Sequence, residues 1–295
     1  MVKVALTGGL GNQMFQYAFA RNIAVKNKSS LCLNTSYLQS KLPFKNLATQ
    51  MRYELDIFNI HAQISHNFFQ SKYAYPFAKI EHILKDLWNS KKLNEVRESH
   101  FHFQPALLHT KDNCYIKGNF QSHKYFIEIE DVIRNDFSFK NKLTNENLAW
   151  QHQIENSNAV SIHFRRGDYI TLKQNVNKFA QIPFSYYQNA IQHIAEKIEN
   201  PVFFIFTDDV HWIKSNFTTE FPYYIVENNN TATTNYLDMQ LMSKCKHNII
   251  CNSTFSWWAA WLNANKNKIV IAPNRWFTDD KINSNDIYPS DWIKL

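Results

Sequence analysis

The sequence predicts an α/β fold in which parallel strands alternate with helices. Apolar runs of strand length recur along the 295 residues, and most are followed by a turn and a stretch of helical composition. A repeated strand–helix order builds parallel sheets with helices on both faces. A chain of this length can also form two cores, so we expect two α/β domains.

The predicted strands fall into two groups, and the segment between the groups lacks the alternation. Residues 46–111 are rich in Phe, His and Lys and favour helices and loops. The polar residues 140–158 are typical of a linker, so the predicted domains are residues 1–150 and residues 151–295. The predicted strands are residues 2–6, 31–33, 159–163, 202–206, 223–226, 248–251 and 269–271.

Composition and charge limit the class of protein. Hydrophobic residues make up 44% of the chain, as in folded globular proteins. No apolar run reaches the roughly 18 residues of a membrane span, and the first residues lack the apolar core of an export signal. We expect a cytoplasmic protein whose net charge of +7 suits an anionic substrate or peripheral contact with the inner membrane. The basic residues form no stripe with interleaved aromatics, so nucleic-acid binding is not expected.

The four cysteines indicate neither a disulfide framework nor a metal centre. They are scattered, with no Cys-x-x-Cys pair and no histidine at zinc-binding spacing. This pattern is typical of a reducing compartment.

Three of the five glycines lie in the segment GGLGNQ, residues 8–13, behind the first predicted strand. Read from Gly9, the dinucleotide fingerprint fails at Met14, and the second predicted strand ends in Asn34 rather than an acid. No Lys-Ser/Thr pair follows the glycines, which excludes a P-loop. The segment is therefore a glycine turn of another kind.

A glycine turn that opens a helix lets the backbone approach a ligand and directs free N–H groups toward it. We expect the helix at residues 12–25, with Asn12 and Gln13 at its mouth. The alternative is a purely structural turn in which Asn12 is the helix N-cap.

The segment AVSIHFRRGDY, residues 159–169, is the strongest candidate site. Strand alternation puts His163 and Arg165 on one face and Phe164 and Arg166 on the other, so the two arginines should have different roles. An arginine at the carboxyl end of a buried strand suits bidentate phosphate binding, and Asp168 can hold an arginine in place. The alternative is a structural ion-pair cluster.

Two further strands end in polar motifs. In FFIFTDD, Asp208 and Asp209 point opposite ways, which favours one ligand contact and one helix N-cap over a metal site; the alternative is that both cap the next helix. In IICNSTFSWWAAWL, Ser253 and Thr254 open a helix that can bind phosphate. The tryptophans of that helix are expected in the core rather than as a sugar platform.

Together these motifs carry a resemblance to a known family. The segments GGLGNQMFQYAFA, HFRRGDY, FTDD and NSTFSWWAAWL occur in this order, and GNFQSHKYF at residues 118–126 is similar to a further family segment. From end to end, the chain resembles the bacterial α1,2-fucosyltransferases of glycosyltransferase family 11. Departures lie outside the motifs, as in residues 58–111, which leaves the acceptor open.

The resemblance implies a fold of the glycosyltransferase B type, with two Rossmann-like domains facing across a cleft. The N-terminal domain would be the acceptor side and the C-terminal domain would bind the donor. The implied reaction is inverting transfer of L-fucose from GDP-L-fucose, without metal or cofactor, to the 2-hydroxyl of a terminal galactose. The acceptor would be an oligosaccharide or a lipid-linked glycan, as in lipopolysaccharide O-antigen biosynthesis.

Carried over to this sequence, the resemblance also implies residue roles. Arg165 would bind the diphosphate with His163 beside it, and Asp208 would read the amino edge of guanine. Asn12 and Gln13 would face the fucose and the phosphate. The other implied donor contacts are Gly9, Gly11, Arg166, Ser253, Thr254 and Ser256.

Chemical reasoning agrees with transfer that uses no metal. Breaking the sugar–phosphate bond builds negative charge on the leaving nucleotide, which a metal or fixed cations must neutralise. No Asp-x-Asp occurs in the sequence, and Arg165, Arg166 and the helix start at 253–256 can supply the positive charge. Loss of Arg165 should lower the rate by about 10²–10³ while leaving the fold.

Inversion in one displacement calls for a base that accepts the proton of the acceptor hydroxyl. His163, Asp168 and Glu54 are the candidates, in that order. Three rival interpretations remain: a nicotinamide or flavin oxidoreductase, which the broken fingerprint disfavours; a carbohydrate-binding protein without activity; and a related sugar-nucleotide transferase with another acceptor.

Overall fold

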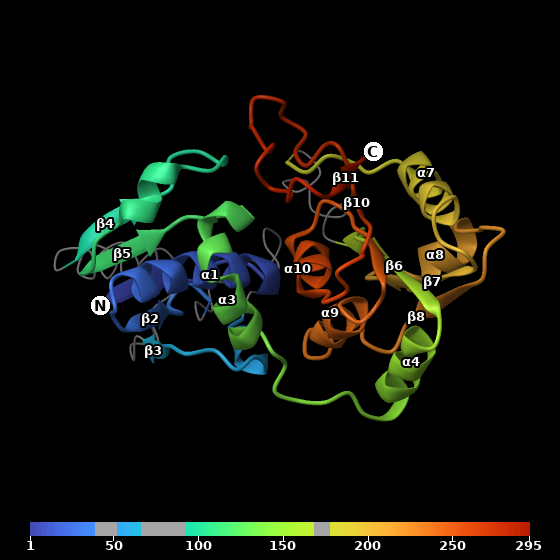
Figure 1. Cartoon of the computed structure of the whole chain (residues 1–295), viewed down its shortest axis with the longest axis horizontal. Coiled ribbons are helices and arrows are strands. Elements are labelled where there is room, and N and C mark those ends of the chain that lie inside the picture. The colour runs from blue at the N-terminus through green and yellow to red at the C-terminus, as the bar shows by residue number, and fades with distance from the viewer. Residues whose placement is uncertain (39–51, 66–92, 168–177) are drawn as a thin grey trace, which may run out of the picture. The chain divides into compact units, whose positions relative to one another are not determined.

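The computed structural model describes residues 1–38, 52–65, 93–167 and 178–295. The chain forms two compact units, drawn in Figure 1. Unit 1 comprises Met1–Lys140 and Asn285–Ile287, and unit 2 comprises Asn141–Ser284 and Tyr288–Leu295. The division lies ten residues before the predicted boundary at 150, which falls inside helix α4 (Asn145–Glu155) of unit 2.

Within the described residues, unit 1 contains a five-stranded parallel sheet. Its strands are β1 (Val2–Ala5), β2 (Leu31–Asn34), β3 (Gln63–Ser65), β4 (Asn94–Arg97) and β5 (Cys114–Lys117). They are ordered β3-β2-β1-β5-β4. At the centre, Val4 pairs with Leu33 and Ile116, and all three are fully buried, so β1 and its neighbours form the core of the unit.

Helix α1 (Leu10–Lys26) packs on this sheet. It is buried on almost all sides; Phe19, for example, stacks on Phe120 with ring centroids 4.2 Å apart. Tyr17 Oη and Arg21 Nε both donate to Asp136 Oδ2, at 2.7 and 2.8 Å, and Asp136 ends helix α3 (Glu130–Asp136). The unit also has short 3₁₀ helices: η1 (Leu55–Ile57), η2 (Pro105–His109), η3 (His123–Tyr125) and η4 (Ile127–Ile129).

Near its C-terminus the chain returns to unit 1. The Ser122 hydroxyl donates to the carbonyl oxygen of Asp286 at 2.7 Å. The Asp286 carboxylate accepts the Phe103 N–H and pairs with Lys124. Unit 1 is therefore discontinuous in sequence, whereas the two predicted domains are consecutive segments.

Unit 2 is built on a second parallel sheet, six-stranded in the part of the chain that is described. Its strands are β6 (Asn158–Phe164), β7 (Pro201–Thr207), β8 (Tyr223–Val226), β9 (His247–Ile249), β10 (Val270–Ala272) and β11 (Ile293–Lys294). The order is β11-β10-β9-β6-β7-β8. Every predicted strand of this half is present, within two residues of its expected ends.

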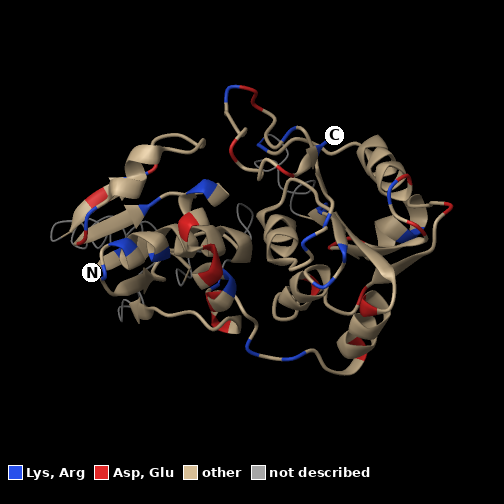
Figure 2. Cartoon of the chain, viewed as in Figure 1, with Lys and Arg blue, Asp and Glu red and all other residues tan. Residues whose placement is uncertain are grey.

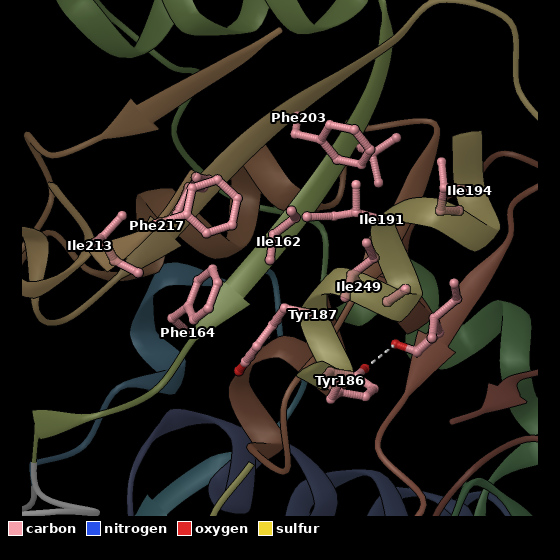
Figure 3. Packing of buried hydrophobic residues seen from close by; sticks show 14 residues of the cluster. Ile162, Phe164, Tyr186, Tyr187, Ile191, Ile194, Phe203, Ile213, Phe217 and Ile249 are labelled. Atoms are coloured by element: carbon pink, nitrogen blue, oxygen red, sulfur yellow. Dashed lines mark hydrogen bonds between the residues drawn. The ribbon is translucent and has the colours of Figure 1, made fainter. Parts of the chain in front are cut away.

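Helices cover both faces of the second sheet. On one face, α7 (Phe184–Ala195) and α8 (Val210–Asn216) pack on β6, β7 and β9; Figure 3 shows Ile162, Phe203 and Ile249 against Tyr187 and Ile191.

On the opposite face lie α4, α9 (Tyr236–Met242) and α10 (Thr254–Leu262). There Asn248 Nδ2 donates to Ser161 Oγ at 2.7 Å and to the Met242 carbonyl at 2.9 Å. Trp257, Trp258 and Trp261 of α10 are at most 4% exposed, so their predicted place in the core is confirmed.

The predicted α/β class with two Rossmann-like parallel sheets is confirmed, and the cleft between the units stays a prediction. Figure 2 shows basic and acidic residues mixed within each unit. None of the helices in the described ranges is long and apolar enough to cross a membrane.

Candidate active site

Three of the sequence motifs converge at one edge of unit 2. β6 lies between β9 and β7 and is parallel to both, so the residues that follow these strands meet at the carboxyl edge of the sheet. Arg165 and Arg166 follow β6, Asp208 and Asp209 follow β7, and Ser253 lies beyond β9. The fold thus brings together motifs that are up to about 90 residues apart in sequence.

Arg165 is held by an acid from the neighbouring strand. Its Nη1 lies 3.1 Å from Asp208 Oδ2, while Asp208 Oδ1 accepts the Arg166 N–H at 2.8 Å. A Cβ on Gly167 would lie 2.6 Å from Asp208 Oδ2, so a larger residue there would displace this carboxylate. Asp168, the acid predicted to hold an arginine, lies outside the described residues, and Asp208 has this role in the structure.

Arg166 has different partners, as the strand alternation predicts. Its Nε lies 3.3 Å from Asp209 Oδ2, and its guanidinium stacks 3.6 Å from the ring centroid of Trp212. Asp209 Oδ1 accepts the Trp212 N–H at 3.0 Å and caps α8. The predicted helix cap is therefore confirmed, since Asp209 caps α8 and Asp208 does not, while the predicted ligand contact of Asp208 stays a prediction.

A pocket of about 140 Å³ opens beside these groups. This is below the roughly 300–1,000 Å³ of a typical ligand pocket, so it has room for only part of a sugar nucleotide. Residues that line it include Arg165, Arg166, Phe184, Tyr187, Trp212 and Asn252. The combination of guanidinium groups and aromatic rings suits an anionic ligand with a planar ring.

Sequence reasoning missed Trp212 and Asn252. Asn252 Nδ2 donates to the carbonyls of Ala180 and Trp276, at 2.8 and 2.9 Å, and so fixes one wall of the pocket. Trp212 could have been identified from its position three residues after the capping Asp209, because a side chain at that position lies over the N-terminus of the helix.

His163 lies behind the site rather than in it. The residue is 5% exposed, and its Nδ1 lies 3.2 Å from Cys251 Sγ. Burial, helped by the charge of Arg165, lowers the pKa of His163 from 6.5 to about 3. Burial also raises the pKa of Cys251 to about 12, so the pair is a neutral thiol against a neutral imidazole, and His163 is a weak proton acceptor.

The start of α10 combines a cap with a half-buried threonine. Ser253 Oγ accepts the Phe255 N–H at 3.4 Å as the N-cap. Ser256 is fully buried and donates to the Ser253 carbonyl at 3.2 Å, so it supports the turn from inside. Thr254 is the partly exposed residue of the predicted set Ser253, Thr254 and Ser256.

In unit 1, the glycine turn starts the helix earlier than predicted. Gly8 has φ of +74°, and Gly9 rather than Asn12 is the N-cap of α1, so the alternative in which Asn12 caps the helix is wrong. A Cβ on Gly8 would lie 2.4 Å from Asn12 Nδ2. Asn12 Oδ1 accepts from Gln121 Nε2 at 2.8 Å, and Gly11 is buried in the first turn.

Gln13 is fully buried and fastens a distant segment to the glycine turn. Its Nε2 donates to the carbonyls of Gly8 and Arg52, at 2.9 and 2.7 Å. Its Oε1 accepts the Glu54 N–H at 3.1 Å. The amide thus has partners at both ends within the protein, and its side chain is not exposed to a ligand.

Glu54 is brought to the glycine turn by this contact. Its side chain is 13% exposed, and Oε1 lies 3.4 Å from Arg52 Nε. The carboxylate also accepts the Leu10 N–H, and Oε2 lies 3.9 Å from the position of a Cβ on Gly9. The pKa of Glu54 is raised by burial, against the lowering effects of Arg52 and the Leu10 N–H.

Comparison with known families decides the identity of this arrangement. The model of the family described as Glycosyl transferase family 11 matches residues 1–295. The chain belongs to glycosyltransferase family 11. The resemblance seen in the motifs is thereby confirmed over the whole chain.

Relatives of this family 11 chain include two proteins of Escherichia coli that match over almost their full lengths. The O-antigen biosynthesis glycosyltransferase WbnK is 36% identical over 98% of this chain and 99% of its own. An alpha-1,2-colitosyltransferase is 32% identical over 100% and 99%. The galactoside 2-alpha-L-fucosyltransferase Sec1 of Mus musculus is 23% identical over 89% of this chain and 64% of its own length. This chain is therefore a glycosyltransferase of family 11.

In this family 11 glycosyltransferase, the carboxyl edge of the unit 2 sheet can bind a phosphate group. Arg165 is oriented by a carboxylate, its side chain is 33% exposed, and a guanidinium can hold two phosphate oxygens at once. No group of three or more His, Cys, Asp or Glu residues suited to a metal ion occurs among the residues described.

Proposed function

We propose that this chain transfers L-fucose from GDP-L-fucose, with inversion, to the 2-hydroxyl of a terminal galactose on an O-antigen-type glycan. The observation that carries the proposal is Arg165, held by Asp208 beside an aromatic pocket at the carboxyl edge of the sheet. The full-length relatives named for O-antigen biosynthesis and for α1,2 transfer support the class of reaction. GDP-L-fucose is a co-substrate, and no cofactor is required.

The proposed donor contacts involve fewer residues than the set predicted from the sequence. Arg165 neutralises the diphosphate as its bond to fucose breaks, and Arg166, Ser253 and Thr254 contribute at the same edge. His163 and Ser256 are buried behind them and act as positioning residues. Asp208 is proposed to orient Arg165, and a contact with the guanine amino group is an alternative use of the same carboxylate.

A second candidate reaction is transfer of colitose, favoured by the 32% identical alpha-1,2-colitosyltransferase. Colitose is L-fucose without its 3-hydroxyl. A site that hydrogen-bonds a substrate hydroxyl rejects an analogue that lacks it by about 10⁴–10⁵. Competition between GDP-fucose and GDP-colitose for one acceptor therefore separates the two reactions, and a preference for GDP-colitose would replace the first proposal.

The first experiment is incubation of the purified chain with GDP-fucose and lactose in the presence of EDTA, with linkage analysis of the product. We expect 2-fucosylated galactose, and Arg165→Ala should lower the rate by about 10²–10³ because the leaving group loses its counter-charge. Arg134→Ala removes an arginine from a surface pair with Glu130 and is the control that should keep full activity. Absence of GDP binding by the wild type, or near-normal transfer by Arg165→Ala, would contradict the proposal.

A further inference from the structure

Transfer to a hydroxyl group releases a proton that some group must accept. The acceptor O–H bond breaks as its oxygen bonds to the sugar, and the electron pair of the sugar–phosphate bond leaves with GDP. On the basis of the function proposed above, we propose that Glu54 in unit 1 accepts this proton and that the acceptor hydroxyl binds beside the Gly9 turn.

The position of Glu54 is built by several independent contacts. The side-chain amide of Gln13 accepts the Glu54 N–H and donates to the Arg52 carbonyl. It therefore holds the backbone on both sides of residue 53. The Glu54 side chain is mostly shielded but still 13% exposed. A base needs this combination, because it must be held in place and reachable from one side.

Among the residues that the structure describes, the space next to the carboxylate is open. If Gly9 carried a Cβ, the nearest atom of those residues outside the turn itself would be Glu54 Oε2, at 3.9 Å. Gly9 therefore leaves room for a ligand atom directly beside the carboxylate. Asn12, on the first turn of α1, lies on the same glycine turn with its side chain near Gly8.

The charge at this turn favours a neutral ligand over a phosphate. The N-terminus of α1 could attract an anion, but Glu54 already accepts the Leu10 N–H there. A phosphate would meet the negative charge of Glu54, whereas a sugar hydroxyl can donate to it. The glycine turn thus suits the acceptor, and its predicted contact with the donor phosphate is disfavoured.

The environment also strengthens Glu54 as a base. Burial raises its pKa above 4.5, and Asp56 acts in the same direction, while Arg52 and the Leu10 N–H act against them. A higher pKa makes a carboxylate a better proton acceptor as long as it stays ionised at working pH. His163, by contrast, is buried with a pKa of about 3, and Asp168 lies outside the described residues.

The test replaces Glu54 by an isosteric amide. Glu54→Gln can still accept the Leu10 N–H but cannot take a proton, so transfer to lactose should fall by about 10²–10⁴ while GDP affinity changes less than about twofold. Glu98→Gln is the matched control. Glu98 is also a shielded carboxylate of unit 1 that accepts backbone N–H groups, from Asn119 and Phe120 at 2.8 and 3.1 Å, and burial raises its pKa as well.

A pH profile separates proton transfer from a structural role. If ionised Glu54 is required, the acid limb of kcat/KM reports its pKa. Arg52→Gln removes a lowering charge and should move that limb to higher pH; Asp56→Asn removes a raising charge and should move it to lower pH. Opposite shifts from two neighbours are not expected if Glu54 only anchors the chain.

Three results would overturn the inference. These are near-normal turnover by Glu54→Gln, an acid limb that neither neighbour moves, and loss of that limb in Asp168→Asn instead. Absence of transfer by the wild type would count against the proposed function and not against Glu54 as such, since every comparison here is made relative to wild-type turnover.

Discussion

At the scale of single residues, Asp208 decides between two accounts of the donor site. The family resemblance implies that it reads the amino group of guanine. In the structure both of its oxygens are engaged, Oδ2 by Arg165 and Oδ1 by the Arg166 N–H. Inosine diphosphate lacks the guanine amino group and keeps the diphosphate, so it can separate the two roles.

We expect Asp208→Asn to weaken GDP and IDP binding equally and to lower transfer by about 10–100-fold, because an uncharged amide orients Arg165 less well. Calorimetric titration with both nucleotides measures this. Gly167→Ala should resemble it, since the added Cβ would displace Asp208 Oδ2, and the double variant should be little worse than either single one. A wild-type preference for GDP over IDP that disappears in Asp208→Asn would instead assign the carboxylate to guanine.

At the scale of elements, the side chain of Gln13 joins α1 to the segment that contains η1. The three hydrogen bonds of its side chain reach Gly8 on one side and Arg52 and Glu54 on the other. The side chain is fully buried. Removing it therefore leaves two carbonyls and one N–H without their partners.

Gln13→Met keeps the approximate volume and should destabilise unit 1 by about 3 kcal/mol or more, since it leaves three groups unpaired and each costs about 1–3 kcal/mol when buried. Hydrogen exchange should accelerate selectively in residues 52–57. The Glu98→Gln variant is a suitable comparison, because it alters a partly buried carboxyl elsewhere in the unit. Unchanged exchange in residues 52–57 would show that other contacts hold this segment.

Other elements show which parts of the fold could be predicted from the sequence. Strands β6, β7 and β8 were predictable because they are long or strongly apolar and follow each other with helices between them. β3, β4 and β5 were missed. β3 and β4 are sheet edges of three and four residues with mostly exposed side chains, and β5 is a buried interior strand of only four residues. The polar composition of residues 140–158 hid α4, which buries little more than Ile154.

The candidate site shows the same limit. Arg165 and Asp209 could be assigned from strand alternation and helix capping, which are local rules. The contact between Gln13 and Glu54 joins residues 41 apart, and no local rule predicts it. Burial of His163 against Cys251 is equally non-local. The sequence alone therefore could not show that His163, the first candidate for the base, is shielded.

At the scale of the whole molecule, two buried groups give the stability of unit 2 opposing dependences on pH. Asp238 is 6% exposed and accepts from Asn229 Nδ2 at 2.8 Å; burial raises its pKa from 3.8 to about 7. The pKa of His163 is lowered from 6.5 to about 3. Asp238 therefore binds a proton more tightly in the folded state, and His163 binds one more weakly.

The signs follow from the protons that each state binds. Between pH 4 and 7 the unfolded chain has lost the Asp238 proton that the folded chain keeps, so this group makes the free energy of unfolding fall as pH rises, by about 1.4 kcal/mol per unit. Between pH 3 and 6.5 the unfolded chain binds a proton at His163 that the folded chain does not, so this group makes stability rise with pH. The two slopes should nearly cancel in the wild type from about pH 4 to 6.5.

Asp238→Asn should reveal the rise of stability with pH that His163 contributes. The amide oxygen can still accept from Asn229, but the carboxyl no longer titrates, so the variant should gain stability over the wild type from pH 4 to 7, on the order of 4 kcal/mol at most. Seven of the eight tryptophans belong to unit 2, with Trp88 the exception, so fluorescence-monitored urea unfolding reports on this unit. A stability difference that stays constant over that pH range would mean that Asp238 keeps an ordinary pKa in the folded chain.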